Sequence, residues 1–348
     1  MKKVFAAIAT IGFLSASCLG PASGLGVIKT VDGGASWQPA VQIDGANNTI
    51  AGVSVAEMGL NPFNHEQLFM AAASGGLWVS DNSASTWREI LSKLSAYDFA
   101  LNPVNPNTIF VVGIYGNHGK IVRSNDGGAS WDEIYNEASA NNSVNTIAIN
   151  PNNPQEIYAG LNSGVLIKSV DNGQTWSVIK EFGDQLLKLR FSKFTGALYA
   201  LLATKGVQKS TDSGANWTNL TVSLNGFSSG NENLLAVIID SYKKMALDDN
   251  QGGIIYITTS KGLYRTTNDG QSWEYVNMPV QSSAELPRAV TSARGGTIVF
   301  VSIGSTLFKS LDGAKTWQTQ SLPTQSSVNK IVIDPILPQV VYAGLINQ

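Results

Sequence analysis

The segment KSVDNGQTW, residues 168–176, decides the fold, because it recurs seven times along the 348-residue chain. Three copies keep the full pattern: a basic residue, a hydroxyl residue, then Asp, Gly, a second hydroxyl residue and Trp at positions 4, 6, 8 and 9. The other four copies depart from this pattern at one to three positions. We call each copy a box. The boxes end at Trp37, Trp87, Trp131, Trp176, Trp217, Trp273 and Trp317.

Each recurring position of the box has a physical role. Apolar and β-branched residues precede the box, as in residues 164–167, and predict a strand. Asp or Asn then folds its side chain onto backbone N–H groups of a tight turn, and Gly supplies a positive φ. Trp opens the next strand with a large apolar surface. The box therefore predicts a β-hairpin turn fixed by Asp32, Asn82, Asp126, Asp171, Asp212, Asn268 and Asp312.

The spacing of the boxes predicts the architecture. Successive box tryptophans are 41 to 56 residues apart, the length of one four-stranded blade of a β-propeller. A second segment recurs about midway between boxes, most fully as IAINPNNPQEIYAG at residues 147–160. Asn-Pro interrupts strand pairing and favours a turn, so this segment predicts strand, turn and strand. Together they predict an all-β fold, a seven-bladed β-propeller of four-stranded antiparallel blades.

The two ends of the repeat array are complementary. Residues 24–43 contain a strand and a box with no Asn-Pro segment before them, whereas residues 328–348 contain an Asn-Pro-like segment with no box after it. We therefore expect residues 328–348 to supply the inner strands of one blade and residues 24–43 its outer strands. Such closure removes exposed sheet edges, and it makes residues 24–348 one domain.

The boxes resemble the Asp-box (BNR) repeat of sialidase-like β-propellers, a family that places the box between the third and fourth strands of a blade. In size and layout the chain is most like the photosystem II assembly and stability factors, which are single seven-bladed propellers behind an export signal. That resemblance implies a protein that binds a protein partner and is not an enzyme. The repeat is also similar to that of xyloglucan-degrading propellers, which hold their substrate between two successive propellers.

The N-terminus predicts export. Lys2 and Lys3 precede an apolar run at residues 4–14, which is too short to span a bilayer as a mature helix and is followed by small residues suited to cleavage. We expect residues 1–17 to be a signal peptide and the mature protein to be periplasmic, on the cell surface or extracellular. Cys18 follows directly, as in bacterial lipoproteins. Lipidation of Cys18, which would be the one membrane attachment, and ordinary secretion both stay open.

Composition argues against several kinds of site. Lys and Arg number 23 against 25 Asp and Glu, a net charge of −2, which gives no basic face for nucleic acid. One cysteine and two histidines, His65 and His118, are too few for a zinc site. Each box offers one carboxylate on a separate blade, whereas calcium needs several oxygens in one loop. We expect no metal, no cofactor and a monomeric protein.

The longest interval between boxes carries an insertion at residues 220–244, which predicts a surface loop with one extra strand. Loops carry binding more often than scaffold strands do. Aromatic side chains are good anchors for both proteins and sugars. We therefore take Phe227 and Tyr242, together with Tyr115, as exposed candidates for a binding surface.

The one tight acidic pair is Asp248 and Asp249, placed where other blades have Asn-Pro. It is either a turn at a strand end or one half of a glycosidase site, which needs a second carboxylate ~5–10 Å away. No acid, base and nucleophile constellation stands out. The sequence therefore predicts a non-catalytic, exported propeller that binds a protein or polysaccharide on one face, and the alternative is a glycoside hydrolase of the sialidase or xyloglucanase type.

Overall fold

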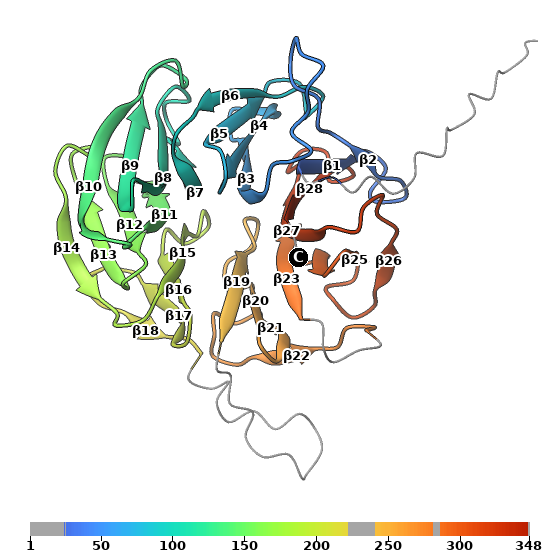
Figure 1. The fold of residues 1–348 in the computed structure, drawn as a ribbon. Coiled ribbons are helices and arrows are strands. Elements are labelled where there is room, and N and C mark those ends of the chain that lie inside the picture. The colour runs from blue at the N-terminus through green and yellow to red at the C-terminus, as the bar shows by residue number, and fades with distance from the viewer. Residues whose placement is uncertain (1–23, 25, 222–240, 281–285, 347–348) are drawn as a thin grey trace, which may run out of the picture.

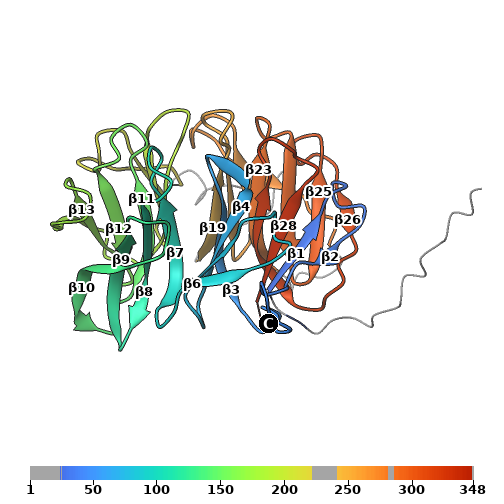
Figure 2. The ribbon, with the colours of Figure 1, turned by 90° about the horizontal axis from the view of Figure 1, so that it is seen from above.

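A computed structural model describes residues 24, 26–221, 241–280 and 286–346. In these ranges the chain forms seven four-stranded antiparallel sheets, which stand as blades around a central axis (Figure 1). Seen from above, the strands of each blade run between the two faces of a flat ring (Figure 2). The described residues form strands without any helix, so none of membrane-spanning length is present there. The predicted seven-bladed, all-β fold is confirmed.

We number the blades in chain order, and within each blade the first strand lines the axis and the fourth lies at the rim. The strands are, for blade 1, β3 (Val55–Asn61), β4 (Asn64–Ala72), β5 (Leu77–Ser80) and β6 (Arg88–Leu91); for blade 2, β7 (Ser95–Leu101), β8 (Ile109–Tyr115), β9 (His118–Ser124) and β10 (Asp132–Ala140); for blade 3, β11 (Val144–Ile149), β12 (Ile157–Leu161), β13 (Val165–Ser169) and β14 (Ser177–Glu181); for blade 4, β15 (Leu186–Phe191), β16 (Leu198–Leu202), β17 (Gly206–Ser210) and β18 (Thr218–Asn219); for blade 5, β19 (Tyr242–Leu247), β20 (Ile255–Thr259), β21 (Gly262–Thr266) and β22 (Glu274–Val276); for blade 6, β23 (Pro287–Ala293), β24 (Ile298–Ile303), β25 (Thr306–Ser310) and β26 (Gln318–Gln320); and for blade 7, β27 (Ser327–Ile333), β28 (Val341–Ile346), β1 (Gly26–Thr30) and β2 (Gln38–Pro39).

Blade 7 joins the two ends of the chain. Its strand order is β2-β1-β28-β27, and β1 pairs antiparallel with β28 so that Ile28 lies opposite Ala343. In Figure 1 the blue N-terminal strand accordingly lies beside the red C-terminal strands. The C-terminal segment supplies the inner strands and the N-terminal segment the outer ones, which confirms the predicted closure of the ring.

The box turn lies between the third and fourth strands of every blade. In blade 3, Asp171 Oδ1 accepts hydrogen bonds from the Thr175 N–H at 2.9 Å and from Ser169 Oγ at 2.8 Å. Its Oδ2 accepts from Thr175 Oγ1 at 2.6 Å. These bonds hold the pKa of the Asp171 carboxyl at about 2. The predicted hairpin turn is confirmed, and Asn82 makes the corresponding bonds to Thr86 in the most modified box.

The basic residue that opens most boxes links one blade to the next. Lys29 Nζ donates to the carbonyl oxygen of Ser83 in the following box at 2.7 Å. Lys309 Nζ donates to the carbonyl oxygen of Gly33 at 2.7 Å, and this bond joins blade 6 to blade 7. The sequence pattern contained this position, but its role as an inter-blade contact became clear only from the structure.

A second constraint, in addition to the turn, requires glycine at the sixth position of the box. Gly173 has φ of +87°, and a Cβ added to it would lie 2.6 Å from Ile134 Cδ1 of blade 2. Gly214 meets Ile179 of blade 3 in the same way, at 2.8 Å. Glycine is therefore required both by the positive φ and by the side chain that the preceding blade packs against it.

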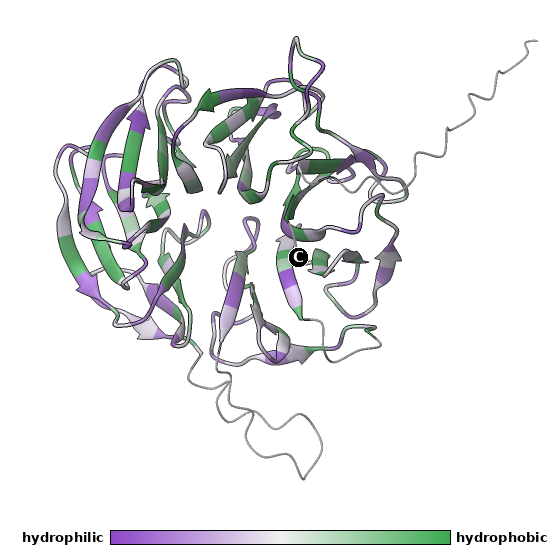
Figure 3. Cartoon of the chain, viewed as in Figure 1, coloured by the Kyte–Doolittle hydropathy of each residue, from purple (hydrophilic) through white to green (hydrophobic). Residues whose placement is uncertain are grey.

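The hydrophobic core lies between neighbouring blades. One cluster joins Val27 and Tyr342 of blade 7 to Met58, Leu68 and Trp87 of blade 1, and each of these side chains is 2% exposed or less. Figure 3 shows hydrophobic segments in every blade, interrupted by hydrophilic ones along the strands. The molecule therefore has seven similar wedges of core and two faces. We call the face with the boxes the box face, and the opposite one, where the inner strands begin, the bulge face.

Candidate functional site

Every inner strand has a β-bulge near its start. In β3 the register shifts between Val55 and Glu57, and the corresponding shift occurs in all six other inner strands. Bulges re-aim side chains and often lie next to functional sites. The residue after the bulge thus has an equivalent position in each blade. We call these residues the axial set: Glu57, Asp98, Thr146, Lys188, Lys244, Ala289 and Lys330.

Ion pairs within the axial set connect distant blades. Lys188 Nζ of blade 4 lies 2.7 Å from Glu57 Oε2 of blade 1 and 2.8 Å from Asp98 Oδ1 of blade 2. Lys330 of blade 7 pairs with the other oxygen of Glu57. Thr146 Oγ1 donates to Asp98 Oδ2 at 2.7 Å. One lysine, Lys188, therefore bridges two carboxylates across the axis of the ring.

These pairs shift the pKa values of Glu57 and Lys188. Burial by itself would raise the pKa of Glu57, but the ammonium groups of Lys188 and Lys330 outweigh it and hold that pKa well below its usual range. For Lys188, burial lowers the pKa, but Asp98 and Glu57 outweigh it, and the net shift is upward. Glu57 is therefore ionised, and Lys188 protonated, throughout the physiological pH range.

Lys244 differs from the other lysines of the axial set. In the part of the chain that the structure describes, no carboxylate lies within ion-pair distance of its ammonium group. Burial lowers the pKa of Lys244 to about 8, and the charges of Lys330 and Lys188 add to this effect against the opposing charge of Glu57. The axial set thus has three lysines for two carboxylates, and Lys244 is the lysine that forms no ion pair with the described residues.

The acidic pair predicted from the sequence does not face the axial carboxylates. Asp248 is 2% exposed, and its two oxygens accept hydrogen bonds from the N–H groups of Asn250 and Gly296, at 2.9 and 2.8 Å, and from other groups. It fills the turn position that Asn150 has in blade 3. Asp249 forms ion pairs with Arg190 at 3.3 Å and with a lysine at 3.2 Å. Both carboxylates therefore stabilise the box-face end of the blades.

The aromatic candidates have different outcomes. Tyr242 is 2% exposed because it begins the inner strand of blade 5, so the expectation of an exposed ring was wrong. Tyr115 is 55% exposed, at the end of β8. Phe227, like Cys18 and the signal peptide, lies outside the described residues.

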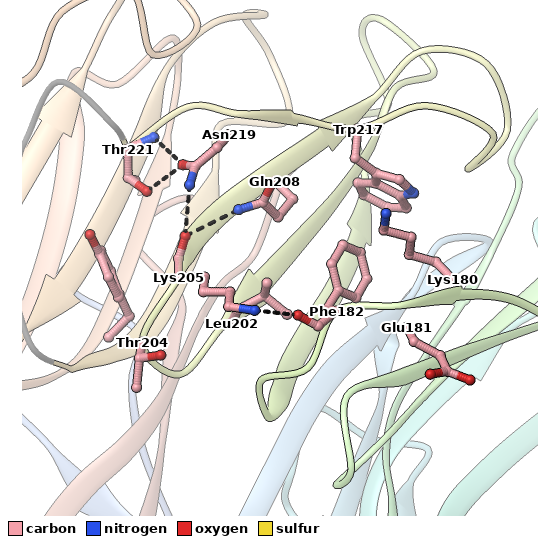
Figure 4. Close-up of a pocket in the computed structure, with 11 residues that line it drawn as sticks. Lys180, Glu181, Phe182, Leu202, Thr204, Lys205, Gln208, Trp217, Asn219 and Thr221 are labelled. Atoms are coloured by element: carbon pink, nitrogen blue, oxygen red, sulfur yellow. Dashed lines mark hydrogen bonds between the residues drawn. The ribbon is translucent and has the colours of Figure 1, made fainter.

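A cavity of about 450 Å³ opens between blades 3 and 4 (Figure 4). Phe182 and Trp217 form one side, with ring centroids 5.1 Å apart at 79°. Figure 4 places Asn219 and Thr221 on the other side and Gln208 between the two sides. Tyr242 also lines this cavity. The sequence candidate Tyr242 therefore belongs to a cavity wall and not to an exposed surface.

Comparison with known proteins supports the fold. No protein-family model matches the chain. Xyloglucanase Xgh74A of Acetivibrio thermocellus is 26% identical over 202 residues, which is 52% of this chain but 23% of that enzyme. The chain therefore spans less than a quarter of the length of this curated relative.

Two solved structures show the same architecture. A GH74 xyloglucanase from Xanthomonas campestris has a TM-score of 0.67 at 15% identity, covering 84% of this chain and 51% of that one. YCF48 bound to D1 peptide has a TM-score of 0.62 at 15% identity, covering 85% of this chain and 93% of that one. At these identities the likeness establishes a shared propeller fold and leaves function open.

Proposed function

We propose that this protein is an exported, non-catalytic propeller that binds a partner on its bulge face, with the axial set as the binding centre. The observation that carries the proposal is the ion-pair arrangement: both axial carboxylates are paired with lysines, while Lys244 has no acidic partner among the residues that the structure describes. A partly buried ammonium group without an acidic partner favours a ligand that brings negative charge. The chemistry that fits is an acidic segment of a protein.

The state of Glu57 argues against its use as a catalytic acid. Glu57 and Asp98 contact the same ammonium group, so their separation alone would suit a retaining glycosidase. Such an enzyme also needs one carboxyl group that is protonated near neutral pH, which requires a raised pKa. The pKa of Glu57 is shifted in the opposite direction. Its role in holding Lys188 and Lys330 fits this geometry better than proton transfer.

Two further observations support a binding role. The axial set breaks the repeat at the centre of the ring, where every inner strand contributes one residue. The match to YCF48 bound to D1 peptide covers 85% of this chain and 93% of that one. YCF48 is therefore a propeller of similar size, and it has a bound peptide. Export rests on the N-terminal sequence pattern alone.

A second candidate function is glycoside hydrolysis, and the sequence similarity to xyloglucanases favours it. In that case Glu57 and Asp98 would be the catalytic pair. Substrate would then have to displace Lys188 from both carboxylates. This requirement makes hydrolysis the less favoured proposal.

A binding screen and a hydrolysis assay on the mature protein distinguish the two functions. The binding arm uses acidic peptides, with neutral peptides of equal length as controls. We expect saturable binding of an acidic peptide that weakens at high salt and falls about tenfold or more in Lys244→Gln. The matched control is Lys193→Gln, because Lys193 is 64% exposed and pairs with Asp249 towards the box face; this variant should bind normally.

The hydrolysis arm uses xyloglucan, other β-glucans and sialosides. We expect no turnover on any of them. Turnover that disappears in Glu57→Gln or Asp98→Asn would overturn the binding proposal in favour of the hydrolase. Turnover lost in Asp249→Asn instead would move the active site to the box-face end of the ring.

A further inference from the structure

Gln208 breaks the repeat at a buried position. It directly precedes the basic residue of its box, and the six other boxes are preceded by apolar residues: Ile28, Trp78, Val122, Ile167, Tyr264 and Phe308. Gln208 is nevertheless only 8% exposed. Burying an amide is unfavourable unless its polar atoms find partners, so the exception calls for a physical reason.

The partners of Gln208 account for only part of its hydrogen-bonding capacity. Its Nε2 donates to the carbonyl oxygen of Lys205 at 3.1 Å. Asn219 Nδ2 donates to the same oxygen at 3.2 Å, and Asn219 Oδ1 accepts from both the N–H and the Oγ1 of Thr221, each at 2.8 Å. A primary amide offers two donors and two acceptor sites. Both amides line the cavity between blades 3 and 4, where their remaining capacity is available to a ligand.

A second cavity provides a matched comparison inside the same molecule. It lies between blades 2 and 3 and has a volume of about 470 Å³. By strand register, Ile167 and Val178 hold the positions there that Gln208 and Asn219 hold in the first cavity. Two cavities of similar size and equivalent position thus differ at this pair of positions, which holds two aliphatic side chains in one cavity and two amides in the other.

The box tryptophans at these two junctions bond differently from four of the other five, and the indole N–H of the fifth, Trp37, has no partner among the described residues. Trp131 Nε1 donates to the carbonyl oxygen of Ile90 in the preceding blade at 2.7 Å, and Trp87, Trp273 and Trp317 also bond to preceding segments. Trp217 instead donates to Gly214 of its own box at 2.9 Å, as Trp176 does to Gly173 at 3.2 Å. At these junctions no indole bridges the blades, and the space beside them stays open.

We propose that the cavity between blades 3 and 4 binds a neutral pyranose ring. Its aromatic side can pack against the C–H face of a sugar, while Gln208 can give and accept hydrogen bonds with hydroxyl groups and Asn219 can donate one through its remaining N–H. A volume of about 450 Å³ falls within the usual range of small-ligand sites, ~300–1,000 Å³. A purely apolar ligand would leave the two amides without partners.

This site is separate from the axial set. Apart from Tyr242, the cavity is lined by residues of blades 3 and 4, including the turn that follows β16, and Lys244 is not one of its lining residues. The proposal therefore extends beyond the proposed function and does not depend on it.

The test measures binding of methyl glycosides of glucose, galactose, mannose and xylose, and of cellobiose, to the whole mature protein by calorimetry and ligand-observed NMR. We expect saturable binding of at least one sugar that falls about tenfold or more in Gln208→Ile and in Asn219→Val. Both variants introduce apolar residues that equivalent positions of the second cavity already hold, so the fold should tolerate them. A melting curve checks this for each variant.

Two controls make the result specific. Ser163→Ala changes the second cavity and should leave sugar binding unchanged, as should Lys244→Gln in the axial set. The proposal is overturned if no sugar of the panel binds the unmodified protein, or if binding survives both Gln208→Ile and Asn219→Val. Failure of acidic peptide binding with sugar binding intact would reject the proposed function and leave this site standing.

Discussion

The box face and the axial set show two uses of one repeat. On the box face, the side chain at position 4 makes the same local hydrogen bonds in blade after blade, as Asp32, Asp126 and Asp312 do. In the axial set the backbone is just as regular, with a bulge in every inner strand, but the side chains vary from blade to blade and four of them form ion pairs. The repeated residues of the boxes therefore stabilise each blade, whereas the non-repeated residues of the axial set are the candidates for a function of the whole ring.

The largest expected effect concerns the closure that makes both regions possible. Deleting residues 328–348 removes β28 and all of β27 except Ser327, which leaves β1 without its partner strand β28 and exposes a sheet edge. We expect loss of cooperative unfolding, with aggregation. Circular dichroism and limited proteolysis would measure this, and a truncated protein as stable as the intact one would show that the ring does not need blade 7.

The second-largest loss of stability is expected on replacing a box tryptophan, and it should differ between Trp87 and Trp176. Trp87 is fully buried and bonds to Ala40 of the preceding blade, so Trp87→Ala should cost about 3–5 kcal/mol. Trp176 is only partly buried and bonds within its own box, so Trp176→Ala should cost about 2 kcal/mol. Denaturant unfolding of the two variants tests this order, and equal losses would mean that the inter-blade bond contributes little.

Breaking the axial ion pairs should cause the third-largest loss of stability. Lys188→Met leaves Glu57 and Asp98 facing each other without their shared cation, which should cost about 2–3 kcal/mol at pH 7, because the site is only partly exposed. Unfolding in urea at pH 7 measures the loss. If Lys188→Met were as stable as the unmodified protein, the ion pairs would not contribute to the fold.

The same variant has a defined pH dependence. The folded-state pKa of Glu57 is depressed, so its contribution to stability is present above its unfolded pKa of ~4.3 and is lost as pH falls through the folded value. The unmodified protein should therefore lose stability on acidification below about pH 4 more steeply than Lys188→Met. Parallel curves for the two proteins would contradict the assigned ion pairs.

The smallest effect belongs to the exposed box turn. Asp171→Ala removes three hydrogen bonds within one turn, and we expect the melting temperature to fall by about 2 °C. The melting temperature of Asp171→Asn should fall less, because Asn82 and Asn268 make the corresponding hydrogen bonds in their own boxes. If Asp171→Asn were the more damaging change, negative charge and not hydrogen bonding would be the role of this position.

How far the sequence predicted the structure depends on whether the cause is local. The box turn and the Asn-Pro turns are fixed by residues within a few positions of one another, so their pattern alone gave the blades and their closure. Lys188 and Glu57 are 131 positions apart and meet only because the ring brings blades 4 and 1 together. A bulge has no comparable residue signature, which is why the axial set was not predicted.

Two outcomes at the candidate site show the same limit. Tyr242 was expected to be exposed because it ends a polar insertion, but the inner strand of blade 5 begins there and buries its ring. Gln208 could have been found from sequence, since aligning the residue before each box shows six apolar residues and one amide. Looking for departures from the repeat, and not only for its copies, would have identified it.

The central claim is that the axial set carries partner binding while the boxes carry stability. The most direct test is the dissociation constant of one acidic peptide, measured with melting temperature for Lys244→Gln and Asp171→Asn. The account predicts that Lys244→Gln weakens binding about tenfold or more with an unchanged melting temperature, and that Asp171→Asn binds normally. Normal binding by Lys244→Gln, with binding lost in a stably folded Asp171→Asn, would contradict it.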